Sequence, residues 1–197
     1  MNILKIFLES LKEDVLDYSK DPQVQDWDPR DLAIEYGTSR LADVIDGMEV
    51  RRYVEDPKES HSFVNLGVFK DKQIITGIAY YYVLDVEKFK INRKVPLIEK
   101  MVVSKEYRGK GLSKELYKVL LNKEGIVFSD LTLFTPTKHL WETFIPSLPN
   151  VEMFNFNDRE GTYSPYSMEE FTKSMDIRVV AVSSNKLKEV IKNDILN

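Results

Sequence analysis

The chain has 197 residues, of which 43% are hydrophobic and 30% are charged, and its formal net charge is −4. This composition is typical of one globular domain with a proper core, and the negative balance excludes a global electrostatic attraction to nucleic acid. The chain has no cysteine, which excludes disulfides, thiolate metal sites and cysteine nucleophiles and fits the cytoplasm, and it has no apolar run long enough to span a membrane.

The N-terminal quarter has the spacing of helices. Apolar residues from Leu4 to Tyr18 predict an amphipathic helix over residues 3–19, which has no small-residue cleavage site and is not a signal peptide. Asp28-Pro29 is typical of a helix start, and the next helix would end near Gly37. A third face is formed by Leu41, Val44, Ile45 and Met48. We therefore expect a helical block over residues 1–55, within a single domain spanning 1–197.

Strands follow this block. Val64, Leu66 and Val68 alternate with other residues, residues 74–84 are apolar on both faces, and residues 95–103 form a further apolar run. Because the connections between these runs are short, we expect an antiparallel meander of three strands.

The second half mixes helices and strands. Leu112, Leu116, Val119 and Leu120 define one face of a helix that extends to about Lys123. We then expect a short strand at 125–128, a helix at 136–145, a strand at 151–156, a loop at 157–167, a helical turn near 168–175 and a strand at 177–183. A helix over 184–197 completes a mixed α/β fold.

The segment Arg108-Gly109-Lys110-Gly111 lies between a predicted strand and a predicted helix. Glycines permit unusual backbone angles, and the first turn of a helix has unpaired N–H groups, so the segment suits a pyrophosphate or a similar anion. A tight turn with solvated charges is the alternative. The dinucleotide-binding fingerprint is excluded, because Lys114 stands where its third glycine would be.

The stretch MVVSKEYRGKGLSKELYKVLL resembles the acetyl-CoA-binding segment of the GNAT (Gcn5-related N-acetyltransferase) superfamily. Met101-Val102-Val103 match the strand of that motif, and Arg108 to Ser113 match its loop, with Ser113 in place of a glycine or alanine. The resemblance covers roughly residues 60–157. A weaker similarity, in FSDLTLFTPTKHLWETF, is to GNAT-like proteins of bacteriophages, for which the location would be the host cytoplasm.

The resemblance implies a GNAT-like fold in which a meander leads to a cofactor-binding helix and to two splayed strands. Acetyl-CoA would be the co-substrate, and its pantetheine arm would pair with the backbone of Met101 and Val103. The strand at Ile126–Phe128 would lie across the cleft. The pyrophosphate would bind Arg108, Gly109, Lys110, Gly111, Leu112 and Ser113.

The resemblance also implies direct attack of an amine on the thioester, for which Glu99 is the candidate base. Strand alternation predicts that Glu99 shares a face with Leu97, Met101 and Val103. A surface or salt-bridged glutamate is the alternative. The tyrosine that the family often uses as the acid is absent from 136–145, which leaves His139, Tyr163 or Tyr166. Packing of the late loop is the alternative for both tyrosines.

Three functions remain open from the sequence. The first is an acetyl-CoA-dependent N-acyltransferase that acts on a small amine, a protein or a modified nucleobase. The second is an inactive module of the same fold that binds acetyl-CoA or a partner protein. The third is an interaction protein that oligomerises through its terminal helices, for example as a homodimer.

The resemblance further implies that the walls of the acceptor site come from residues 20–40 and 157–167, with Trp27, Tyr163 and Tyr166 as candidates. His61 and His139 are too few for a metal site, so no metal is expected.

Overall fold

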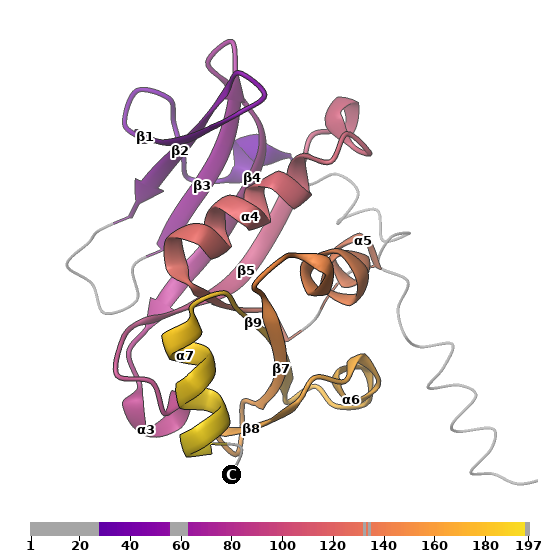
Figure 1. Ribbon diagram of the computed structural model, residues 1–197. Coiled ribbons are helices and arrows are strands. Elements are labelled where there is room, and N and C mark those ends of the chain that lie inside the picture. Colours follow the sequence, from indigo (N-terminus) through magenta and orange to yellow (C-terminus); the bar gives the residue numbers. More distant parts are fainter. Residues whose placement is uncertain (1–27, 56–62, 132, 134, 196–197) are drawn as a thin grey trace, which may run out of the picture.

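The structure is a computed structural model, and it describes residues 28–55, 63–131, 133 and 135–195. These residues form one mixed sheet of nine strands in the order β1-β2-β3-β4-β5-β6-β9-β7-β8, with helices on both faces (Figure 1). The strands are β1 (Arg40–Ile45), β2 (Met48–Val54), β3 (Phe63–Lys70), β4 (Gln73–Val83), β5 (Val95–Val103), β6 (Ile126–Phe128), β7 (Glu152–Asn157), β8 (Thr162–Pro165) and β9 (Ile177–Val182).

The helices are short apart from the one that follows β5. The α-helices are α3 (Val86–Phe89), α4 (Leu112–Glu124), α5 (Thr135–His139), α6 (Met168–Lys173) and α7 (Asn185–Val190). The 3-10 turns are η1 (Pro29–Asp31), η2 (Lys105–Tyr107) and η4 (Ile145–Ser147), and the π-helical turns are η3 (Leu140–Phe144) and η5 (Ile191–Ile195). No helix in the described ranges is both long and apolar enough to cross a membrane.

The helix predicted from Leu41 to Met48 is wrong, because this stretch is the β1–β2 hairpin at one edge of the sheet. Asp46 and Gly47 form its turn with positive φ angles of 48° and 76°, which two-residue hairpin turns require. Asp28 does cap a helical turn, but that turn ends at Asp31 instead of continuing to Tyr36. The predicted helix at 3–19, Trp27 and His61 lie outside the described residues.

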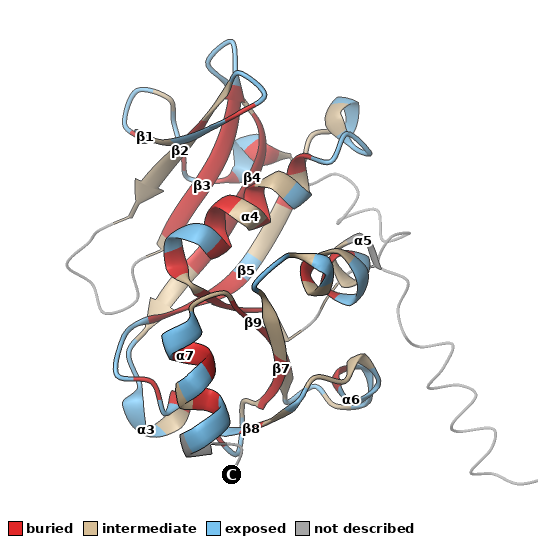
Figure 2. Ribbon diagram, viewed as in Figure 1, coloured by how far each residue is buried: buried red, intermediate tan, exposed pale blue. Residues whose placement is uncertain are grey.

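The predicted meander is confirmed, since β3, β4 and β5 are consecutive antiparallel neighbours. One face of the meander is covered by α4, whose apolar side includes Leu116, Tyr117 and Leu120 and joins one large core (Figure 2). In the C-terminal half, α3 and α7 cover the opposite face, because Phe89 and Leu187 share a second core with inward residues of β6 and β9. The central strand β4 is buried on both sides, as its apolar sequence predicts, because Leu32 and Ile34 pack with Ala79 on the face opposite α4.

The C-terminal half is attached through β6, which is parallel to β5 and antiparallel to β9. The predicted loop at 157–167 is partly wrong, because Thr162–Pro165 forms β8 and pairs with β7. The predicted helix at 136–145 begins as α5 and continues as a π-helical turn. The predicted C-terminal helix is α7, which also ends in a π-helical turn.

Candidate functional site

The candidate anion site is the turn that joins β5 to α4. Ser104 fixes its start, because its backbone N–H and its hydroxyl both donate to the carbonyl oxygen of Ile75, at 2.9 and 3.0 Å. After one 3-10 turn, Gly109 and Gly111 have φ angles of +75° and +80°, which favour glycine strongly. Gly111 is the N-cap of α4. The two glycines are thus required for the chain to reverse into the helix.

The space in front of this turn is open. A Cβ added at Gly109 or Gly111 would have no heavy atom within 4 Å. Gly111 has no side chain that could cap α4. The backbone N–H groups of Leu112 and Ser113 in the first turn therefore receive no hydrogen bond from a capping side chain. Backbone N–H groups at the positive end of a helix, beside open space, suit a pyrophosphate group. The residues present therefore fit the anion that the sequence predicts.

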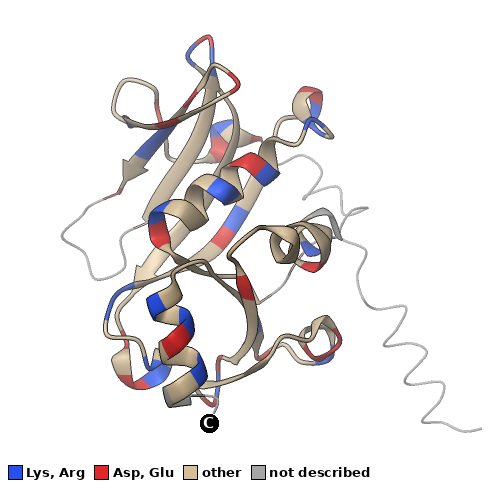
Figure 3. Cartoon of the chain, viewed as in Figure 1, with Lys and Arg blue, Asp and Glu red and all other residues tan. Residues whose placement is uncertain are grey.

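Basic side chains surround the turn, although acidic ones are interspersed (Figure 3). The Nε–H of Arg108 donates to the carbonyl oxygen of Val103 at 3.2 Å. The ammonium of Lys110 lies 4.6 Å from the centre of the Tyr107 ring, and that of Lys114 lies 5.1 Å from the centre of the Phe144 ring. Two of the cations near the start of α4 thus make cation–π contacts with aromatic rings.

The predicted splay of two strands is confirmed. Within the described residues, β5 and β6 are paired only at Leu97 and Phe128. Directly after β6, the N–H of Ser129 donates to the carbonyl oxygen of Val179 in β9 at 2.8 Å, so the chain follows β9 and leaves β5. Met101 and Val103 lie on the part of β5 beyond the contact with Phe128. The two strands therefore diverge next to Glu99, where the family resemblance places the donor cleft.

Glu99 is the extra residue of a β-bulge. Tyr80 in β4 is opposite Ile98, and Ala79 is opposite Lys100, so Glu99 has no residue opposite it. The bulge resets the alternation of side chains, and as a result Leu97 lies in one core while Met101 packs against the other. Strand alternation predicts that Leu97 and Met101 both share a face with Glu99. This prediction is wrong, because Leu97 and Met101 lie on opposite faces of the sheet. Sequence alternation cannot anticipate a bulge.

The environment of Glu99 favours its protonated form. Partial burial raises the pKa of Glu99, and the nearby negative charges of Asp130 and Glu55 raise it further, whereas Lys100 lowers it. Glu99 is nevertheless exposed. An exposed carboxyl group with a raised pKa suits a base that accepts a proton from substrate. Sequence reasoning missed Asp130, although Ser129-Asp130 directly follows β6 and indicates where that strand ends.

Tyr163, the candidate acid, lies in the core. Only 7% of its surface is exposed, its ring packs against Phe156, and its hydroxyl donates to the carbonyl oxygen of Phe89 at 2.9 Å. Burial raises the pKa of Tyr163 far above its usual range. Its surroundings are those of a packing residue, which is the alternative that the sequence left open.

The other two candidates for the acid also have local partners. The hydroxyl of Tyr166 donates to the carbonyl oxygen of Trp141 at 3.2 Å. Burial raises the pKa of Tyr166, and the charge of Glu142 adds to this shift. His139 is exposed, and its ring nitrogen Nε2 lies 3.4 Å from the hydroxyl of Thr143. None of these contacts joins a candidate acid to Glu99.

The tyrosines at 80–82 are part of the fold. The hydroxyls of Tyr80 and Tyr82 both donate to the carboxylate of Glu124 at the end of α4, at 3.2 and 2.7 Å. Arg52 donates to the hydroxyl of Tyr82 at 3.3 Å. This largely buried network attaches the end of α4 to β4 of the meander.

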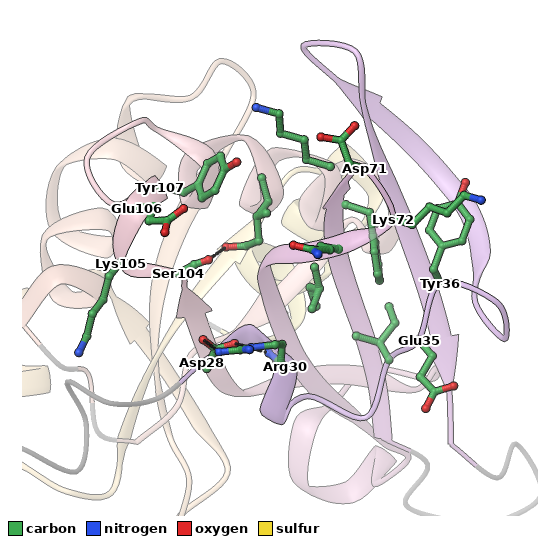
Figure 4. A pocket seen from close by; sticks show the side chains of 16 residues that line it. Asp28, Arg30, Glu35, Tyr36, Asp71, Lys72, Ser104, Lys105, Glu106 and Tyr107 are labelled. Carbon is green, nitrogen blue, oxygen red and sulfur yellow. Dashed lines mark hydrogen bonds and ion pairs between the residues drawn. The ribbon is translucent and has the colours of Figure 1, made fainter.

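A separate pocket of about 990 Å³ lies near the start of the anion turn (Figure 4). Ser104 and Tyr107 lie on one side, and Asp71 and Lys72 of the β3–β4 turn lie on the other side together with Tyr36. Both acidic and basic side chains line the pocket. Glu99 does not line it, so the pocket is distinct from the place where β5 and β6 diverge.

Across the parts of the chain that the structure describes, no group of three His, Cys, Asp or Glu residues could hold an ion.

Comparisons with known proteins identify a family. Residues 19–125, more than half of the chain, match the Acetyltransferase (GNAT) family. A solved structure from Bacteroides thetaiotaomicron, assigned to the acetyltransferases of the GNAT family, is similar to 71% of this chain and 70% of its own, with 12% identity and a TM-score of 0.36. No curated protein matches the chain in sequence.

Proposed function

The chain belongs to the GNAT family of acetyltransferases, and we propose that it transfers the acetyl group of acetyl-CoA to an amine. The observation that carries this proposal is the combination of an open turn at Gly109 and Gly111 with the divergence of β5 and β6 beside Glu99. An anion-binding turn alone would suit many ligands. Its position at the end of β5, next to a stretch of that strand with no paired strand on the β6 side in the described residues, suits a long donor that has a phosphate group and an extended arm.

The donor would be held mainly by the backbone. Its pyrophosphate would bind the turn from Arg108 to Ser113, and its arm would lie along β5 at Met101 and Val103. When bound, acetyl-CoA supplies a thioester whose acetyl group an amine can attack. Backbone contacts explain why Ser113 is tolerated where the family pattern has a smaller residue, because its N–H is unchanged.

Glu99 would act as the base. An amine is protonated near neutral pH, and it becomes a nucleophile only after it loses a proton. A carboxylate with a raised pKa is a stronger base than an ordinary glutamate. The charges of Asp130 and Glu55, which contribute to the raised pKa of Glu99, would also attract an ammonium ion. We therefore propose that the acceptor is cationic before the proton is removed.

Two measurements test this function. The first is binding of acetyl-CoA by calorimetry, and the second is release of free CoA in the presence of a panel of small amines and lysine peptides. Binding together with amine-dependent release supports the enzyme. Binding without release from any amine would favour a non-catalytic module, and absence of binding would contradict both.

A further inference from the structure

The chain turns away from β5 at one residue after β6, and this turn separates the two strands where we propose that the donor binds. Ser129 follows β6 directly, and no part of its surface is exposed. Its N–H donates to the carbonyl oxygen of Val179 at 2.8 Å, and its hydroxyl oxygen accepts from the N–H of Val179 at 2.9 Å. Both bonds lead to β9. Without them, the chain could continue beside β5 as a parallel strand, in the register that Leu97 and Phe128 begin.

A buried arginine binds the backbone carbonyl group of Ser129. The Nη1 of Arg178 donates to the carbonyl oxygen of Ser129 at 2.9 Å, and its Nε donates to Asp158 at 2.7 Å. The second carboxylate oxygen of Asp158 accepts from Lys88 at 3.0 Å. Arg178 is only 7% exposed, so its charge needs this compensation. We call Ser129, Arg178 and Asp158 the Ser129 clamp.

The charge of Asp158 is secured by its neighbours. Burial alone would raise the pKa of Asp158, but the hydrogen bonds from Arg178 and Lys88 outweigh burial and lower it. The carboxylate therefore stays ionised well into the acid range, and the guanidinium keeps one fixed orientation.

We propose that the Ser129 clamp consists of positioning residues for acetyl transfer: it holds the chain after β6 against β9 and so keeps the edge of β5 free for the donor. This inference rests on the proposed function. The clamp also fixes the next residue, Asp130, whose charge acts on Glu99. The contacts of the Ser129 clamp would thus determine both the separation of β5 and β6 and the electrostatic environment of Glu99. None of its members needs to touch substrate.

The test compares variants of the clamp with a variant that only weakens the neighbouring core. Ser129→Ala removes both hydrogen bonds of the hydroxyl, the one accepted from the N–H of Val179 and the one donated to the carbonyl oxygen of Asp130. Arg178→Gln removes the charge, and Arg178→Lys keeps the charge but not the paired N–H donors of the guanidinium. The control is Ile191→Val, because Ile191 is fully buried in the core beneath β6 and β9 and does not belong to the clamp. Thermal unfolding of all four variants identifies those that remain folded.

We expect the KM for acetyl-CoA to rise at least about tenfold in Arg178→Gln and about threefold in Ser129→Ala, with kcat within about threefold of the original. Arg178→Lys should recover part of the loss. The midpoint of the pH–rate profile should move to lower pH, because a displaced Asp130 would no longer raise the pKa of Glu99. Glu55 would still raise that pKa, and Lys100 would still lower it. If KM and the midpoint change no more than in Ile191→Val, the clamp is only structural and the proposal is wrong.

A readout without ligand separates this proposal from the proposed function. Hydrogen exchange at the amides of Ser129 and Asp130 should become at least about tenfold faster in Arg178→Gln, and should stay unchanged in Ile191→Val. If the unmodified protein bound no acetyl-CoA, the proposed function would be wrong. The exchange rates alone would then test whether the Ser129 clamp holds the chain against β9. Equal exchange rates in Arg178→Gln and Ile191→Val would show that it does not.

Discussion

Arg108 donates a hydrogen bond from its Nε to the carbonyl oxygen of Val103, 3.2 Å away across the turn between β5 and α4. The two partners are proposed to bind different parts of the donor, the carbonyl its arm and the guanidinium its pyrophosphate. A carbonyl oxygen can accept two hydrogen bonds, and a guanidinium has five N–H donors, so this bond can persist while both groups bind the donor. The bond would then hold the Arg108 side chain at the turn, where its two Nη groups would bind phosphate.

Replacing Arg108 by methionine should weaken acetyl-CoA binding about tenfold at low salt, since a charge-assisted contact to phosphate is lost. Arg108→Lys keeps the charge and should stay within about threefold of the original Kd. Calorimetry at two salt concentrations checks both expectations. The difference in Kd between Arg108→Met and Arg108→Lys should become smaller at high salt, because salt screens the charge. Equal affinities for Arg108→Met and the original chain would contradict a role of Arg108 in binding.

Replacing Gly111 by alanine or valine should abolish acetyl-CoA binding while leaving the protein folded. The new side chain would point into the open space where the anion is proposed to lie, and the φ angle of +80° would be strained by about 1–2 kcal/mol. Gly47→Ala is a matched control. Gly47 has a φ of +76° and equally open surroundings, but it lies in the β1–β2 turn. Similar losses of stability with loss of binding only at Gly111 would support the anion site, whereas binding retained by Gly111→Val would refute it.

Replacing Glu99 by glutamine should lower kcat by about 10²–10⁴-fold and leave the Kd for acetyl-CoA nearly unchanged, because the carboxylate acts on the amine. The original rate should rise with pH as Glu99 loses its proton, through a midpoint above the ordinary glutamate value. Asp130→Asn should shift that midpoint to lower pH, since it removes a charge that raises the pKa. A fall of less than about threefold in Glu99→Gln at unchanged affinity would argue against any role as base.

Replacing Tyr163 by phenylalanine tests the packing role. The variant should lose about 0.5–1.5 kcal/mol of stability, because one hydrogen bond to Phe89 disappears from the core. Its kcat should stay within about twofold of the original at every pH. Tyr166→Phe provides the comparison, since it removes a similar bond from a less buried tyrosine. A large fall in kcat with unchanged stability in the Tyr163 variant would restore it as a candidate acid.

The sequence predicted β5, the glycine turn and α4 correctly because local signals specify all three. An apolar run, two glycines and an apolar helix face each determine their own conformation. The β1–β2 hairpin was missed, although Asp46-Gly47 is a strong turn signal, because helical spacing from Leu41 to Met48 was given more weight.

Other features depend on contacts between distant residues. The bulge at Glu99 arises from the pairing of β4 with β5, and no residue in β5 marks it. Likewise, β8 is a short edge strand whose pairing with β7 decides whether Tyr163 is in a loop or in the core. The candidate base was therefore found by its position in a motif, while the surroundings that tune it required the structure.

The single paired position between β5 and β6 in the described part of the chain also bears on the order in which the protein folds. Strands β1 to β5 meet through nearby turns, so their ladder closes short loops and can form early. The hydrogen bond between Ser129 and Val179, in contrast, joins residues that are fifty apart in the chain. Because the cleft exists only once that distant contact has formed, a half-folded chain could already present the glycine turn but would have no second wall for a substrate. Completion of the reactive centre is thus expected to coincide with the slowest step of folding.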